Sequence, residues 1–364
     1  MVIPNIGAFM AWGLITSLFI PTGWLAKTSL DWDWDALTGN IVGPMIVYLL
    51  PVLVAYTGGK LIHGHRGGVL GAVAVLGVIG GASFELASGA SAQNVPQFLG
   101  AMIVGPLAGY VMREVDKWLE DKRPAGFEML INNFSQAISG LFLALLGYLV
   151  IGPITSSIAN AFGNMVEGLS DAGLLPLMDL PIEVGKVLFL NNAINHGVLT
   201  PLGTTDVAET GRSIYYMLES NPGPGLGLLL AYWFAGKGLA KLSAPGAIVI
   251  HFFGGIHEVY FPYVLMNPVM IGAMWAGGIV ADIVFVIFDA GLTGPPSPGS
   301  IFAYFSFLPS NGGAVAGVLL GIAAGAAAAF IVGSILLKLF PVPEIDDSDD
   351  DTSLDDAMEG VPLN

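Results

Sequence analysis

The sequence predicts an all-α polytopic membrane protein with about eight to ten transmembrane helices and two re-entrant hairpin-like segments. Of its 364 residues, 54% are hydrophobic and only 11% are Asp, Glu, Lys or Arg. Soluble domains have about 25% charged residues, so a chain this apolar could not cover a water-facing surface with polar groups. The 50 glycines and 23 prolines are typical, in an apolar chain, of packed transmembrane helices that contain breaks.

The first half shows a regular series of apolar runs, and a spanning helix needs about 20 mostly apolar residues. These runs cover residues 6–21, 41–57, 69–84, 98–112 and 129–151. A second group covers residues 223–235, 263–288 and 312–337, and the last of these runs carries no charge. We expect these eight runs to form the membrane-embedded body.

The distribution of Lys and Arg predicts the orientation of the spans. Basic residues lie between the second and third runs, between the fourth and fifth, and after the last one, whereas the loop at residues 31–35 holds three aspartates and no base. Because cytoplasmic loops are enriched in Lys and Arg, we expect both termini in the cytoplasm of a multi-pass protein of the cytoplasmic membrane. Membrane lipid is then an obligatory partner.

The second half is interrupted by many prolines, and two of its runs, residues 184–202 and 292–308, are too short or too broken to span. Broken backbone at membrane depth is tolerated where it is buried in protein or lines a cavity, and it often marks the binding site of a transporter. We therefore predict a scaffold and dimerisation domain at 1–152 and a substrate-transport domain at 153–340. Residues 341–364 are rich in acids and are predicted to be a disordered cytoplasmic tail.

Overall charge and composition exclude several functions. The formal charge of −16 argues against nucleic acid as a partner, because binding phosphates requires basic patches. The sequence contains no cysteine, which excludes disulfides, thiolate metal sites and cysteine nucleophiles within it. We expect no cofactor and no metal site.

The richest polar cluster inside an apolar run is at residues 190–197, where Asn191, Asn192, Asn195 and His196 lie within six residues. These side chains offer many hydrogen-bond donors and acceptors without net charge, which suits a neutral polyhydroxylated ligand better than an ion. The alternative is a hydrogen-bonded break in a helix.

A second cluster places His257 beside Glu258 in another apolar run. A buried carboxylate can accept hydrogen bonds from hydroxyl groups or take a proton from one of them. The alternative is a structural carboxylate that pairs with a Lys or with the backbone. Metal ligation by His251, His257 and Glu258 has weaker support, because a spacing of six does not put both histidines on one helical face.

Several longer segments carry a resemblance to a known family. They are MVIPNIGAF at 1–9, GFEMLINNFS at 126–135, LFLNNAINHG at 188–197 and GGIHEVYFPYVLMNP at 254–268, together with residues 19–24, 56–60, 221–225 and 297–301. The chain resembles the membrane component (IIC) of the bacterial mannitol-specific phosphoenolpyruvate:sugar phosphotransferase system, from residue 1 to about 340.

The resemblance implies a homodimer of elevator type that carries mannitol or a related hexitol inward and presents it for phosphorylation. It places His196 and Glu258 at the sugar site, and we expect mannitol to be held by Asn191, Asn195, His196 and Glu258. Glu258 would orient the terminal hydroxyl or accept its proton, and His257 would hold the carboxylate in place.

The same resemblance makes the chain an enzyme only as the translocating subunit of a protein-phosphohistidine:mannitol phosphotransferase. Because the sequence holds no cysteine, the expected phosphoryl donor is a separate phosphorylated IIB protein, supplied in turn by IIA, HPr and enzyme I.

Two other functions remain open at this point. An ion-coupled secondary transporter for polyols or sugars would need a pair of buried carboxylates, and Asp282 and Asp289 are seven residues apart and could share a helical face. A sugar-sensing subunit would bind the ligand without transporting it.

Overall fold

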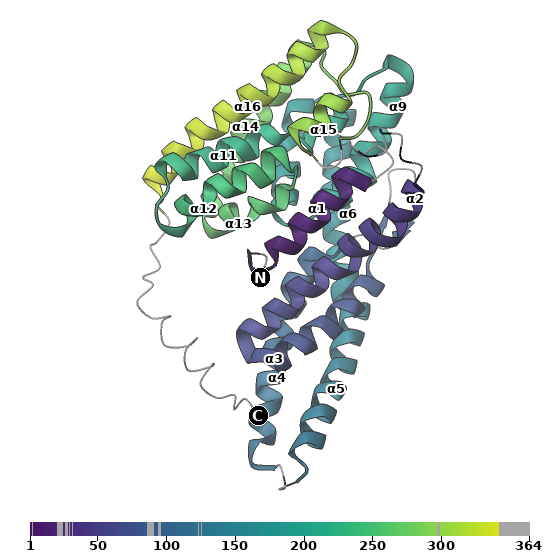
Figure 1. Ribbon diagram of the computed structural model, residues 1–364, viewed down its shortest axis with the longest axis vertical. Coiled ribbons are helices and arrows are strands. Elements are labelled where there is room, and N and C mark those ends of the chain that lie inside the picture. Colours follow the sequence, from purple (N-terminus) through teal and green to yellow (C-terminus); the bar gives the residue numbers. More distant parts are fainter. Residues whose placement is uncertain are drawn as a thin grey trace.

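A computed structural model describes residues 1, 3–19, 25, 28, 30, 32–85, 91–93, 96–122, 124, 126–296 and 299–341. In these residues the chain is helical almost throughout (Figure 1), apart from a short antiparallel pair of strands, β1 (Ser83–Glu85) and β2 (Ser91–Gln93). The predicted all-helical framework is therefore confirmed. The predicted acidic tail lies outside the described residues, save for residue 341.

Within the described ranges, five helical stretches are long and apolar enough to cross a membrane: Trp34–Gly81, Phe98–Lys122, Glu128–Asp171, Pro268–Ile287 and Gly312–Leu339. Most of the predicted runs lie inside them, which supports a multi-pass membrane protein. Three runs differ. The first falls on the shorter helix α1 (Ile6–Phe19), and the run 223–235 falls on α11 (Pro222–Ala235), which has 14 residues. The run 263–288 is broken at Asn267, before α14 (Ile271–Ile287) begins.

The first stretch is more than twice as long as one span because the chain turns back within it. It begins with α2 (Trp34–Leu37), η3 (Thr38–Val42) and η4 (Met45–Leu49), and continues as α3 (Leu50–Gly81). His63 (φ −145°, ψ 48°) and Gly64 (φ 52°, ψ −152°) leave the helical conformation, so α3 is a helical hairpin. A Cβ atom on Gly59 would overlap the carbonyl oxygen of Gly67, so the two arms touch through their backbones.

The turn of the hairpin is fastened to α4 (Phe98–Leu119), which continues into η5 (Glu120–Lys122). Arg66 donates to both carboxylate oxygens of Asp116, from Nε at 2.9 Å and from Nη2 at 3.0 Å. His63 Nε2 lies 2.7 Å from Asp116 Oδ2. Such a bidentate pair fixes orientation as well as distance, so the turn between the predicted second and third spans is held in one place.

The close contact at Gly59 gives a test of the hairpin. Gly59→Ala should lower the free energy of unfolding by about 1–3 kcal/mol, because a methyl group forced against a packed backbone moves one arm away from the other. Gly39→Ala is the matched control, since a Cβ atom there has no heavy atom within 4 Å. The measurement is the melting temperature of the purified protein in detergent. Equal melting temperatures for the two variants would contradict the hairpin contact.

A long helical stretch links the first group of helices to the second. It consists of α5 (Glu128–Leu146), η6 (Gly147–Ile151) and α6 (Gly152–Asp171), and it passes through residue 152 without a break. The domain boundary at 152 stays a prediction, because a continuous helix neither supports nor opposes it.

The second half consists mainly of short helices. They are η7 (Leu175–Leu177), α7 (Asp179–Val187), α8 (Asn191–Ile194), η8 (Asn195–Leu199), α9 (Thr200–Thr210), α10 (Tyr215–Leu218), α11 (Pro222–Ala235), α12 (Gly238–Ile248), η9 (Val249–Phe253), η10 (His257–Val259), α13 (Phe261–Met266), η11 (Pro268–Met270), α14 and α15 (Ile301–Ser306). The last described helix is the long α16 (Gly312–Leu339), which lies beside α11 and α14 (Figure 1). In the described residues of the two runs that the sequence predicts to be broken, 184–202 is interrupted by a turn at 188–190, and 292–308 holds turns and the short helix α15.

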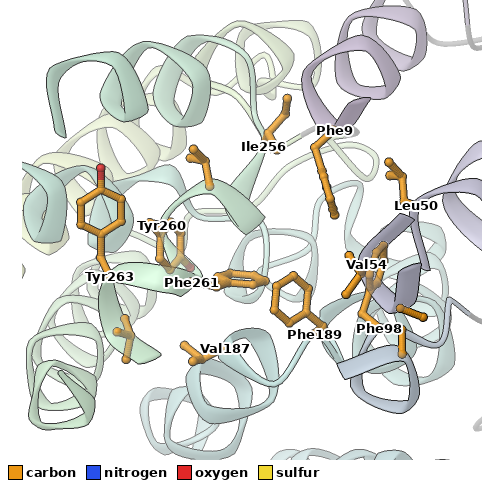
Figure 2. Packing of buried hydrophobic residues seen from close by; sticks show 14 of the residues in the cluster. Phe9, Leu50, Val54, Phe98, Val187, Phe189, Ile256, Tyr260, Phe261 and Tyr263 are labelled. Carbon is orange, nitrogen blue, oxygen red and sulfur yellow. The ribbon is translucent and has the colours of Figure 1, made fainter. Parts of the chain in front are cut away.

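A line of aromatic rings joins the first group of helices to the second (Figure 2). Phe9 of α1 lies against Phe98 of α4, with ring centroids 5.6 Å apart, and Phe98 lies 5.4 Å from Phe189. Phe189 then meets Phe261 edge to face at 5.0 Å. These four rings are buried, so one hydrophobic core is shared between the helices near the N-terminus and the broken segments near the polar clusters.

Candidate functional site

A sharp turn positions the first polar cluster. Helix α7 ends at Val187, and the chain reverses through Phe189, whose φ of 61° is in the left-handed region. Hydrogen bonds from Phe189 N to Lys186 O and from Leu190 N to Gly185 O, both 2.8 Å, close this turn. The helical chain then resumes at Asn191, so the orientation of α7 determines where Asn191 lies.

Two amide–carboxylate pairs form the centre of the site. Asn191 Nδ2 donates to Glu258 Oε1 at 3.1 Å, and Asn195 Nδ2 donates to Glu219 Oε2 at 2.7 Å. Thr200 Oγ1 donates to the other end of the Asn195 amide at 2.9 Å. Glu258 and Glu219 are only 4% and 7% exposed. A carboxylate oxygen can accept more than one hydrogen bond. Both carboxylates can therefore accept further hydrogen bonds from the hydroxyl groups of a ligand, in a site with little exposure to solvent.

The rings of His251 and His257 lie close together, although a spacing of six residues does not place both on one face of a helix. Chain reversal at Gly255 (φ 77°) brings the rings of His251 and His257 to 4.6 Å. Each Nε2 lies 3.0 Å from a backbone carbonyl oxygen, that of Pro222 for His251 and that of Gly299 for His257. Because a carbonyl can only accept, each Nε2 donates and is occupied by that bond.

The expected contact of His257 with Glu258 is not the one the structure shows. The carboxylate of Glu258 is held by Asn191, and His257 faces Gly299. The two residues are neighbours in η10, a 3₁₀ helix, in which successive side chains point about 120° apart. His257 thus holds the segment before α15 against the site, and Asn191 orients the carboxylate.

Helix α7 contributes charges that sequence reasoning did not consider. Asp179, Glu183 and Lys186 are each at most 1% exposed, and Lys186 Nζ donates to Glu183 Oε1 at 2.8 Å. The ammonium group also lies 5.7 Å from the centre of the Tyr260 ring and interacts electrostatically with Glu219. The spacing of four and then three residues, which places all three on one face of a helix, is the signal that could have revealed them.

The structure brings Asn191 and Glu258 into direct contact and places Asn195 and His257 beside them. The backbone of His196 lies in η8, but its side chain, like that of Asn192, lies outside the described part of the structure. Among the residues that are described, there is no group of three or more His, Cys, Asp or Glu side chains that could hold a metal ion.

The carboxylate pair considered for an ion-coupled transporter is not formed. Asp282 is fully buried in α14, whereas Asp289 follows the end of that helix and has a side chain that is 85% exposed and paired with Arg212. The helix ends before the seven-residue spacing can place both side chains on one face.

Residues 1–277 match the family model described as "Phosphotransferase system, EIIC". The chain belongs to this family. Over 338 residues it is 54% identical to the PTS system mannitol-specific EIICB component of Geobacillus stearothermophilus. The aligned residues cover 93% of this chain and 67% of that relative. This chain is 50% identical over 346 residues to the EIICB component of Bacillus subtilis (strain 168), covering 95% and 68%.

A longer relative has the same similarity over a smaller share of its length. The PTS system mannitol-specific EIICBA component of Escherichia coli (strain K12) is 50% identical over 347 residues, which are 95% of this chain and 51% of the relative. The EIIC chain thus spans about two thirds of the EIICB relatives and half of the EIICBA relative. No solved structure matches it. The resemblance expected from the motifs at 188–197 and 254–268 is confirmed at the level of the family.

Proposed function

We propose that this EIIC chain is the mannitol permease of a phosphotransferase system, which binds the hexitol, carries it inward and presents it for phosphorylation. The observation that carries the proposal is the presence of two amide–carboxylate pairs, the buried pair of Asn191 with Glu258 and the partly buried pair of Asn195 with Glu219. A linear polyol displays a row of hydroxyl groups, and each group needs both a donor and an acceptor. The three relatives described above are mannitol-specific components, which agrees with this ligand.

The geometry supports a role for Glu258 in the chemical step. One of its oxygens accepts from Asn191, and the carboxylate can accept a further hydrogen bond from the terminal hydroxyl of the sugar. In phosphorylation, that hydroxyl oxygen forms a bond to phosphorus, the bond between phosphorus and the cysteine sulfur of a phosphorylated IIB unit breaks, and the hydroxyl proton passes to Glu258. Asn195 and His196 bind other hydroxyl groups.

The phosphoryl donor in this proposal lies outside these 364 residues, since they include no cysteine. It is a IIB unit that receives its phosphoryl group from IIA, HPr and enzyme I in turn. Transport occurs in a homodimer with both termini in the cytoplasm, eight to ten spans and two re-entrant segments. Residues 153–340 move relative to 1–152 as in an elevator, and the many short helices around the two amide–carboxylate pairs support a movable substrate domain.

The test compares binding with phosphorylation. Membranes that contain only this chain should bind radiolabelled mannitol but form no mannitol phosphate, and added phosphorylated IIB should start product formation. Matched membranes without the chain control for background. Mannitol phosphate formed without IIB would overturn the role of the donor. Free mannitol accumulated under an ion gradient, again without a donor, would show a secondary transporter.

A further inference from the structure

Three carboxyl groups and one ammonium group meet between α7 and α14, beside the candidate sugar site. Asp179, Glu183 and Lys186 come from α7 and Asp282 comes from α14, and all four are at most 1% exposed. A Cβ atom on Gly278 would overlap the carboxylate of Asp179, so this carboxylate lies against α14 one helical turn before Asp282. Asp282 interacts electrostatically with both Asp179 and Glu183.

The charges in this cluster do not balance. Lys186 is hydrogen-bonded to Glu183 at 2.8 Å, which leaves the two aspartates. Among the described residues, Asp179 Oδ1 and both carboxylate oxygens of Asp282 are buried without a hydrogen-bond partner. Two adjacent buried carboxylates cannot both stay ionised without compensation, because each unpaired buried charge costs several kcal/mol.

The groups that face the cluster from other elements make the imbalance larger. Glu219, which follows α10, interacts electrostatically with Lys186 and Glu183, and Glu258 in η10 interacts with Lys186. Tyr260, after η10, lies against the same ammonium group. Lys186 is therefore shared among several acids. A calcium-like ion would need six or more oxygen ligands, which the described residues do not gather.

We propose that Asp179 and Asp282 share one proton and form a proton-binding site that fastens α7 to α14. Two neighbouring buried carboxyl groups can hold one proton between them, since one then donates to the other and only one charge remains. Because the turn after α7 places Asn191, release of the proton would push the two helices apart and displace one side of the sugar site.

The sign of the pH effect follows from linkage. Aspartate in an unfolded chain releases its proton at about pH 3.9, and a proton shared by Asp179 and Asp282 belongs to the folded state alone, because only folding brings these two residues together. The folded state therefore binds one more proton, and stability falls as pH rises until the pair itself is ionised. In that window the unfolding equilibrium constant increases about tenfold for each pH unit.

The experiment measures the melting temperature in detergent between pH 5 and pH 9, without sugar, for the full chain. The variants are Asp282→Asn, Asp179→Asn and the control Asp171→Asn, whose side chain is exposed at the end of α6. Wild type and Asp171→Asn should lose thermal stability with rising pH. Each of the two buried variants should show a flatter dependence and a higher melting temperature than wild type at pH 9, because an amide has the size and the donor of a protonated carboxyl.

The outcomes decide between a proton and its competitors. A wild-type pH slope retained in Asp282→Asn and Asp179→Asn, or failure of both variants to fold, would overturn the proposal. A melting temperature that rises with sodium chloride but not with choline chloride, and loses this rise in Asp282→Asn, would show a bound cation instead. None of these melting-temperature measurements uses mannitol, so their outcome does not depend on the proposed function. A separate titration should show mannitol binding that weakens toward pH 9 in wild type and Asp171→Asn but not in the two buried variants.

Discussion

Glu258→Gln is expected to weaken mannitol binding by about ten- to a hundred-fold. The change keeps the size of the side chain and its contact with Asn191 but removes the charge that a sugar hydroxyl would meet. A hydrogen bond to a charged group contributes about 1.5–3 kcal/mol, and each 1.4 kcal/mol is about tenfold in affinity. Equilibrium binding of radiolabelled mannitol to membranes measures the loss.

The same variant should lose more in the chemical step than in binding. If Glu258 accepts the hydroxyl proton, single-turnover phosphorylation at saturating mannitol should fall by a further factor of about 10² or more. His196→Ala should weaken binding with a smaller effect on the single turnover. Glu209→Gln, the same change at an exposed position of α9, is the matched control. Normal binding and turnover in Glu258→Gln would mean that the carboxylate is structural.

Lys186→Met is expected to have the largest effect on stability. It leaves Glu183 buried without its partner, and breaking a buried ion pair by removing one member typically costs about 3–5 kcal/mol. The side chains of both residues have no exposed surface, so water cannot compensate for the missing ammonium group. The melting temperature in detergent and the yield of folded protein measure the loss.

The double variant Glu183→Gln with Lys186→Met distinguishes a lost pair from lost packing. It removes the stranded charge while keeping similar volumes, and such replacements of whole buried pairs are often nearly neutral. The double variant should therefore recover most of the melting temperature lost in Lys186→Met. A double variant as unstable as the single one would show that Lys186 acts through the other acids around it, Glu219 and Glu258.

The helical framework could be predicted from the sequence because it depends on hydropathy. The runs 98–112 and 312–337 became α4 and α16 with longer ends. What hydropathy could not show is α7, since a search for apolar runs treats Asp179, Glu183 and Lys186 as breaks. These charges are buried by packing against other elements, α14 and Tyr260 among them, and that packing is tertiary.

Part of the site could also be predicted from hydropathy. Asn191 and Glu258 were recognised as polar residues in apolar runs, and the structure joins them by a hydrogen bond. Glu219 was missed because it follows the short helix α10 and becomes a partner of Asn195 only in the folded chain. Helical spacing gave a meeting of His251 with His257 weak support, because that spacing does not hold across the reversal at Gly255.

The line of rings from Phe9 through Phe98 and Phe189 to Phe261 bears on how easily the two groups of helices would slide past each other. Aromatic pairs at these distances attract each other by about 0.5–1.5 kcal/mol beyond the area they bury, and the attraction varies gently as one ring slides along the next. The four phenylalanine rings themselves have no charge and no hydrogen-bonding group, so sliding one ring along the next breaks neither an ion pair nor a hydrogen bond. The resistance to sliding along these rings would depend on ring size and temperature, and it would change little with ionic strength.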